Sequence, residues 1–156
     1  MFDSKKSRNQ FGYTFGASIT DFPIHYLSFQ AEYTRINPFV YNNAIESQTY
    51  TNYKYSLGDW MGNNADRIIL SLKYTPMPKL KLMARYQTLR KGDAGTIPAQ
   101  YYQEPQPPFL FGTVTNRNEI FLSAQYEMIN KLFFYGTYSK WNDLGSSFKL
   151  GFSYGL

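Results

Sequence analysis

The segment FLSAQYE, residues 121–127, alternates apolar and polar side chains along its length. One side of an extended chain here carries Leu122, Ala124 and Tyr126, and the residues between them are polar. A period of two is the signature of a β-strand with two unlike faces. The apolar side of such a strand can face a protein core or the acyl chains of a membrane, and the rest of the sequence has to distinguish these two.

The order apolar, polar, tyrosine recurs in the same phase in the segments AEY, LKY, ARY and AQY, which end at Tyr33, Tyr74, Tyr86 and Tyr126. The spacing between these tyrosines is uneven, which argues against the fixed repeat of a solenoid. Alternation extended along the chain predicts seven strands. They are expected at 11–19, 26–35, 67–75, 80–89, 118–127, 132–141 and 148–156.

The connections between these strands alternate in length. On one side all three are short, at 20–25, 76–79 and 128–131. On the other side 36–66 and 90–117 are long, and only 142–147 is short. Outer-membrane barrels have short periplasmic turns and longer external loops. Strands of about 9–11 residues also match the tilted span of a bilayer. Both features favour a membrane β-barrel.

Tyrosines gather at both ends of the predicted strands, on the apolar face. With the short connections on the periplasmic side, the outer rim takes Tyr33, Tyr86 and Tyr138, and the inner rim takes Tyr74, Tyr126 and Tyr154. Barrels carry an aromatic girdle at each membrane interface, whereas a soluble sandwich has no reason to place rings at both strand ends on one face. The predicted fold class is therefore all-β, an antiparallel transmembrane β-barrel with meander topology.

Composition excludes several other classes. The chain has no cysteine, which argues against a disulfide-stapled domain and against thiolate metal sites. No run approaches the roughly 18 apolar residues of a membrane helix. The net charge of +5 comes from scattered cations, apart from the cluster of Lys5, Lys6 and Arg8, and no basic stripe continues it. We expect no nucleic-acid partner.

The two ends of the sequence suggest a portion of a larger barrel. Residues 1–10 form a polar segment without the apolar run of a signal peptide. Seven strands would leave two edges of unpaired backbone groups in lipid, and the smallest barrels have eight strands. We therefore expect residues 11–156 to be the C-terminal part of a larger outer-membrane barrel. The final segment KLGFSYGL resembles the C-terminal signature by which such barrels reach their insertion machinery, which is an expected partner.

Two carboxylates and four cations of the predicted strands are expected to point into the lumen. The expected network comprises Glu32 and Glu119 with the cations Lys73, Lys81, Arg85 and Lys149. Charges in a confined interior need partners, so a structural network is favoured over an ion-selectivity ring. The single histidine, His25, lies beside a short connection and away from the external face. No cluster has metal-ligand spacing, and we predict no enzymatic activity and no cofactor.

The two long connections are rich in aromatic rings and amides. Loops of this length are usually either functional or disordered. Disordered segments contain few aromatic residues, so the aromatic content favours functional loops. Rings can stack on the C–H faces of sugars while amides bond hydroxyl groups, which suits a polysaccharide ligand. The candidate glycan contacts are Tyr41, Tyr50, Tyr53, Trp60, Asn64, Tyr101 and Tyr102. Alternatively, the rings pack the loops on themselves and close the barrel mouth.

Four stretches of these loops, AEYTRINPFVYNN, QTYTNYKYSLGDWMGNNAD, RKGDAGT and YYQEPQPPFLFG, resemble the C-terminal half of the capsule-assembly Wzi family as found in Bacteroidetes-type bacteria. The resemblance covers roughly residues 11–156. It implies an outer-membrane barrel of a Gram-negative bacterium, in contact with membrane lipid, that acts as a surface lectin for capsular polysaccharide. The motif residues are Asn37, Pro38, Tyr41, Tyr50, Tyr53, Gly58, Gly62, Asn64, Asp66, Arg90, Lys91, Gly92, Pro105 and Pro108. The alternative function is that of a passive porin or solute channel.

Overall fold

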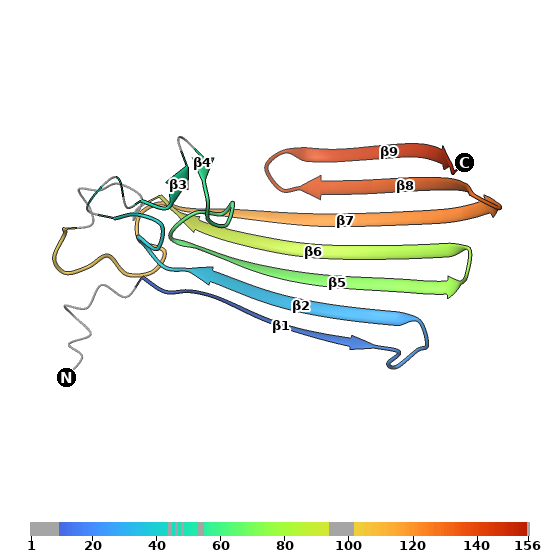
Figure 1. Ribbon diagram of the computed structural model, residues 1–156, viewed down its shortest axis with the longest axis horizontal. Coiled ribbons are helices and arrows are strands. Elements are labelled where there is room, and N and C mark those ends of the chain that lie inside the picture. The colour runs from blue at the N-terminus through green and yellow to red at the C-terminus, as the bar shows by residue number, and fades with distance from the viewer. Residues whose placement is uncertain are drawn as a thin grey trace. The chain divides into compact units, whose positions relative to one another are not determined.

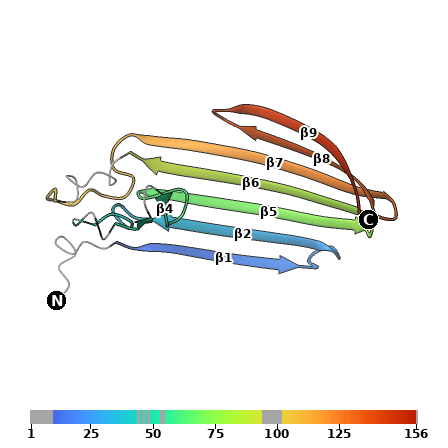
Figure 2. The ribbon, with the colours of Figure 1, turned by 45° about the horizontal axis from the view of Figure 1, so that its top comes forward.

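The computed structural model describes residues 10–43, 45, 47, 49–52, 55–93 and 102–155. A seven-stranded antiparallel sheet dominates them, and its strands follow one another in chain order (Figures 1 and 2). The strands are β1 (Gly12–Thr20), β2 (Leu27–Ile36), β5 (Ala65–Met77), β6 (Leu80–Gly92), β7 (Val114–Ile129), β8 (Leu132–Trp141) and β9 (Gly145–Tyr154). Within the described part of the chain, no helix has the length and apolar character needed to cross a membrane.

All seven strands predicted from the alternation are confirmed, and so is the antiparallel all-β fold class. The strand order is linear, with β1 and β9 at its two ends, so the described sheet is not closed. One element was not expected: β3 (Thr51–Asn52) and β4 (Tyr55–Ser56) pair as a small hairpin inside the first long connection. Strands of two residues are too short to show a period in the sequence.

On the central strands β5 and β7, the apolar face is more exposed than the polar face. On β7, Leu122 is 45% exposed whereas Glu119 on the opposite face is 5% exposed. On β5, Leu72 is 41% exposed and its neighbour Ser71 only 7%. A soluble sheet buries its apolar side, and an outer-membrane strand points that side at lipid and its polar side at the lumen. The burial pattern of these two strands is consistent with part of a β-barrel.

The chain divides into two compact units. The first takes its described residues from Met1–Phe15, Tyr33–Arg67 and Leu89–Asn116, and the second consists of Gly16–Glu32, Ile68–Thr88 and Arg117–Leu156. Unit 1 holds both long connections, and unit 2 holds the short turns. The described candidate ligand-binding residues of the loops therefore lie in unit 1.

Unit 1 has a small apolar core made of Ile36, Met61, Ala65 and Leu89. Ile36, Ala65 and Leu89 lie on the polar face of their strands. They are in phase with the buried polar residues Thr34, Ser71 and Gln87, respectively. Met61 comes from the first long connection, and Val40 and Tyr41 of the same connection pack against the core. The first long connection therefore folds against the polar face of these strands.

Candidate functional site

Asn64 joins the two long connections. Its side chain is buried, its Oδ1 accepts a hydrogen bond from the Leu110 backbone N–H at 2.7 Å, and its Nδ2 donates to the Phe111 carbonyl at 2.9 Å. A Cβ at Gly92 would lie 2.3 Å from Asn64 Nδ2 and 2.5 Å from the Phe111 carbonyl oxygen, so only glycine fits there. Asn64 was a candidate glycan contact, but its amide is occupied and buried, which gives it a structural role.

Lys91 fixes the end of the first long connection. Its ammonium donates hydrogen bonds to the backbone carbonyls of Met61 and Asn63. Lys91 lies five residues beyond Tyr86, outside the strand segment proposed to cross the bilayer, and burial lowers the pKa of its ammonium from the ordinary value. Gly62, between the two bonded carbonyls, has a φ of 68°, a conformation that favours glycine.

An ion pair and a hydrogen bond connect the ends of β2, β5 and β6 that lie next to the long connections. The guanidinium of Arg90 on β6 donates to both carboxylate oxygens of Asp66 on β5, at 2.9 and 2.5 Å. The Tyr33 hydroxyl of β2 donates to the same carboxylate at 3.2 Å. Asp66 is buried while Arg90 is half exposed. This bidentate geometry fixes the relative position of the three strand ends.

Asn64, Lys91 and the Asp66–Arg90 ion pair form the framework of the loops. In the same unit, Tyr41 and Tyr50 form a stacked pair, with ring centroids 6.0 Å apart and ring planes 22° apart. The rings border a pocket of about 340 Å³. Its remaining lining residues are Gln10, Val40, Asn42 and Asn43. Tyr50 is 54% exposed, so a large part of its ring remains accessible to a ligand. Two aromatic rings and three amides therefore converge on one hollow.

Tyr41 is held in place from three directions. A Cβ at Gly58 would lie 2.4 Å from Tyr41 Cζ, so the ring packs directly on the glycine. The Asp59 backbone N–H donates to the Tyr41 hydroxyl at 3.0 Å, and the Tyr41 backbone N–H donates to Asn63 Oδ1 at 2.8 Å. The Tyr50 backbone N–H in turn donates to the Tyr41 carbonyl at 2.9 Å. The pair is thus a platform formed before any ligand arrives.

Hydrogen bonds also order the amides around the pocket. Asn63 Nδ2 donates to Asn42 Oδ1 at 2.8 Å, and Gln10 Nε2 donates to the Asn42 carbonyl at 3.2 Å. Asn43 Oδ1 accepts a bond from the Ile45 backbone N–H at 3.0 Å. These bonds hold amide groups at the rim of the pocket, where donors and acceptors for hydroxyl groups are needed.

Two other predicted aromatic contacts, Trp60 and Tyr102, do not line this pocket. Trp60 is 62% exposed, and the guanidinium of Arg67 lies 5.6 Å from its ring centroid. Tyr102 is exposed on the second long connection. Tyr53 and Tyr101 lie outside the described residues. Of the five candidates within the described residues, Tyr41 and Tyr50 line one pocket together.

Two members of the predicted lumen network contact each other in the structure. Arg85 and Glu119 form an ion pair at 3.0 Å, and the Arg85 guanidinium also lies 5.1 Å from the Phe121 ring centroid. Three further members lie on the same polar face: Glu32, which is half-buried, and Lys73 and Lys149, which are exposed. Lys81 is exposed as well. Over the described ranges, no group of three metal-ligating side chains gathers that could hold a metal ion.

Comparison with known proteins gives one match. The family described as Capsule assembly protein Wzi matches residues 2–142. This range includes β1 to β8, both long connections, the stacked pair and the framework around Asn64 and Lys91. Neither a curated protein nor a solved structure matches the chain.

Proposed function

Because the chain belongs to the capsule assembly protein Wzi family, we propose that its external loops bind extracellular or capsular polysaccharide without covalent chemistry. The family is one of outer-membrane capsule assembly proteins. The proposal rests on one observation, the stacked rings of Tyr41 and Tyr50 beside three amides in a pocket of about 340 Å³. The sheet that carries the loops lies in the outer membrane of a Gram-negative bacterium.

The chemistry of the pocket suits a sugar. A pyranose has an apolar C–H face that packs on an aromatic ring, and hydroxyl groups around its edge that bond amides. The pocket volume is near the lower end of small-ligand sites, which fits one or two sugar units of a longer chain. Because Gly58 and Asp59 already fix Tyr41, little ordering is needed on binding.

Removal of the accessible ring should abolish most of the binding. We expect Tyr50→Ala in the intact protein to weaken binding of purified capsular polysaccharide about tenfold or more, since aromatic anchors dominate such contacts. Tyr50→Phe should bind as the wild type does, because the stacking face remains. The affinity is measured by calorimetry or by glycan pull-down.

Tyr55→Ala is the matched control, because Tyr55 is an exposed tyrosine of the same connection that does not line the pocket. It should retain wild-type affinity. Equal affinities of the Tyr50→Ala variant and the wild type would contradict the proposed site.

The alternative function, a passive porin, requires an open path along the polar face. The packing of Met61 against Ile36 and Leu89 supports a capped mouth instead. We therefore expect the intact protein to give no stepwise single-channel conductance in planar bilayers. Regular conductance steps would favour the porin.

We further propose that additional strands of the intact protein close the barrel. The edges of β1 and β9 carry backbone groups that would each cost several kcal/mol if left unpaired in hydrocarbon. The exposed apolar row of β9, with Phe148, Leu150 and Phe152, also supports recognition of this strand by the outer-membrane insertion machinery.

A further inference from the structure

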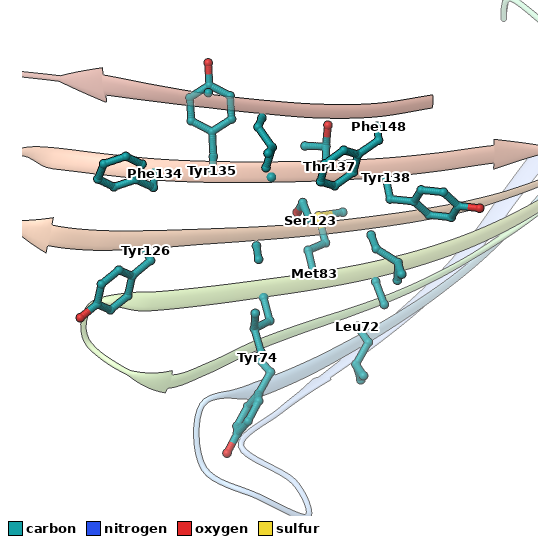
Figure 3. Close-up of a pocket in the computed structure, with 17 residues that line it drawn as sticks. Leu72, Tyr74, Met83, Ser123, Tyr126, Phe134, Tyr135, Thr137, Tyr138 and Phe148 are labelled. Atoms are coloured by element: carbon teal, nitrogen blue, oxygen red, sulfur yellow. The ribbon is translucent and has the colours of Figure 1, made fainter. Parts of the chain in front are cut away.

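The apolar face of unit 2 contains a hollow of about 780 Å³ (Figure 3). Its floor is a small pair, because Ala124 of β7 lies directly opposite Gly136 of β8. Such a volume is within the usual range for small-molecule sites. The side chains of Ala124 and Gly136 are small, so the apolar surface is recessed at this pair.

Larger pairs enclose the small pair on both sides. Tyr126 lies opposite Phe134 on one side, and Leu122 lies opposite Tyr138 on the other. Figure 3 shows Tyr126 and Phe134 at one end of the hollow and Tyr138 at the other. The hollow therefore has an apolar floor and walls, and an aromatic ring at each end.

A cation follows the hollow on the same face. Lys140 is two residues beyond Tyr138 on β8, so the two side chains point to the same side of the sheet. Lys140 is exposed, and its partners in the strand register are Ile120 and Ser146, neither of which is acidic. In contrast, the cation Arg117 on the other face pairs with Asp143 at 2.7 Å.

We propose that this hollow binds an acyl chain of a phosphate-bearing outer-membrane lipid, with the phosphate held by Lys140. The proposal rests on the membrane placement given above. An apolar hollow next to a lysine matches an amphiphile with an anionic headgroup. From Phe134 to Lys140, β8 extends roughly 20 Å, comparable with the roughly 15 Å of hydrocarbon in one leaflet.

A second copy of this chain is the other conceivable occupant, and charge argues against it. In a two-fold symmetric contact through this hollow, the Lys140 side chains of both copies would lie near the same apolar surface, so two positive charges would come close together. Nothing acidic lies opposite Lys140 in the register to offset that charge. A lipid phosphate supplies the missing anion.

Native mass spectrometry of the intact protein tests the proposal. The protein is folded into phosphatidylcholine vesicles doped with lipid A, extracted in mild detergent, and the retained lipid is counted. We expect the wild type to retain lipid A in preference to phosphatidylcholine. Lys140→Gln should lower lipid A occupancy about fivefold, as loss of one lysine–headgroup attraction predicts.

Filling the floor of the hollow is the second arm. Ala124→Leu should remove retained lipid, whereas Ala17→Leu, the same change on the apolar face of β1 and outside the hollow, should leave it unchanged. Equal retention in these two variants would overturn the proposal, as would a wild type that carries no lipid or a dimer in its place. Polysaccharide affinity of the same variants should stay at the wild-type value, so failure here is distinguishable from failure of the proposed function.

Discussion

Ala124→Arg is expected to destabilise the folded protein in lipid vesicles by about 2–4 kcal/mol, the cost of an arginine at the lipid-facing bilayer midplane of a barrel. The apolar-face residues of β7 run from Ile120 to Met128, and Ala124 is the central one. A guanidinium there has no water and no partner. The free energy of unfolding is measured by urea titration of the intact protein in vesicles.

Ser123→Arg is the matched control, because Ser123 is the adjacent residue on the polar face and has a similar size. An arginine there reaches the lumen side, so the loss of stability should be far smaller. If the two variants were destabilised equally, or if Ser123→Arg were the worse, the assignment of faces would be wrong.

Asn64→Ala is expected to separate the two long connections. The change leaves the Leu110 N–H and the Phe111 carbonyl without their partner, and each buried group left unpaired costs about 1–3 kcal/mol. The loss should be confined to the loops of unit 1. Hydrogen exchange of the Leu110 amide and limited proteolysis near it measure the effect in the intact protein.

Asn52→Ala gives the comparison, because Asn52 is an exposed asparagine of the same unit. Its exchange and cleavage rates should match those of the wild type. Gly92→Ala should reproduce the Asn64→Ala effect, since its Cβ would collide with the Asn64 amide and the Phe111 carbonyl. Unchanged protection of Leu110 in both loop variants would mean that Asn64 does not hold the connections together.

The strands could be predicted because the face of each residue is a local property of an alternating sequence. β8 begins and ends at the predicted residues, 132 and 141. The prediction for β7 was too short: the strand begins at Val114 and ends at Ile129, beyond the predicted 118–127. Residues such as Thr115 and Asn116 are polar on both faces, so the alternation there gives no signal.

The sequence predicted which types of residue form the site, but it did not predict which residues contact one another there. Tyr41 and Tyr50 were named separately as aromatic contacts, and the structure stacks their rings on each other, which the sequence did not indicate. Their ligand remains a prediction. Gln10 was missed because it meets Asn42 across 32 residues of sequence, a separation over which no local pattern carries information. Sequence also could not separate the buried amide of Asn64 from exposed ones.

The glycines of the family-like stretches have a physical explanation that the sequence alone did not provide. Gly58 leaves room for the Tyr41 ring, and Gly92 leaves room for the Asn64 amide and the Phe111 carbonyl. Lys91 caps two carbonyls of the same connection. These three residues of the family-like stretches therefore shape the loops that carry the candidate pocket. Among the family-like residues, Tyr41 and Tyr50 line the pocket itself.

The central claim is that the exposed apolar face contacts acyl chains. Nitroxide labels at Leu70, Leu122 and Ala124 of the intact protein in vesicles test it, with labels at Ser71 and Ser123 on the polar face for comparison. The spin relaxation rate of the first three labels should rise strongly with dissolved oxygen, which partitions into lipid. It should rise only weakly with a water-soluble nickel chelate. Labels on the apolar face that are shielded from oxygen, or more accessible to the chelate than the serine labels, would contradict the account.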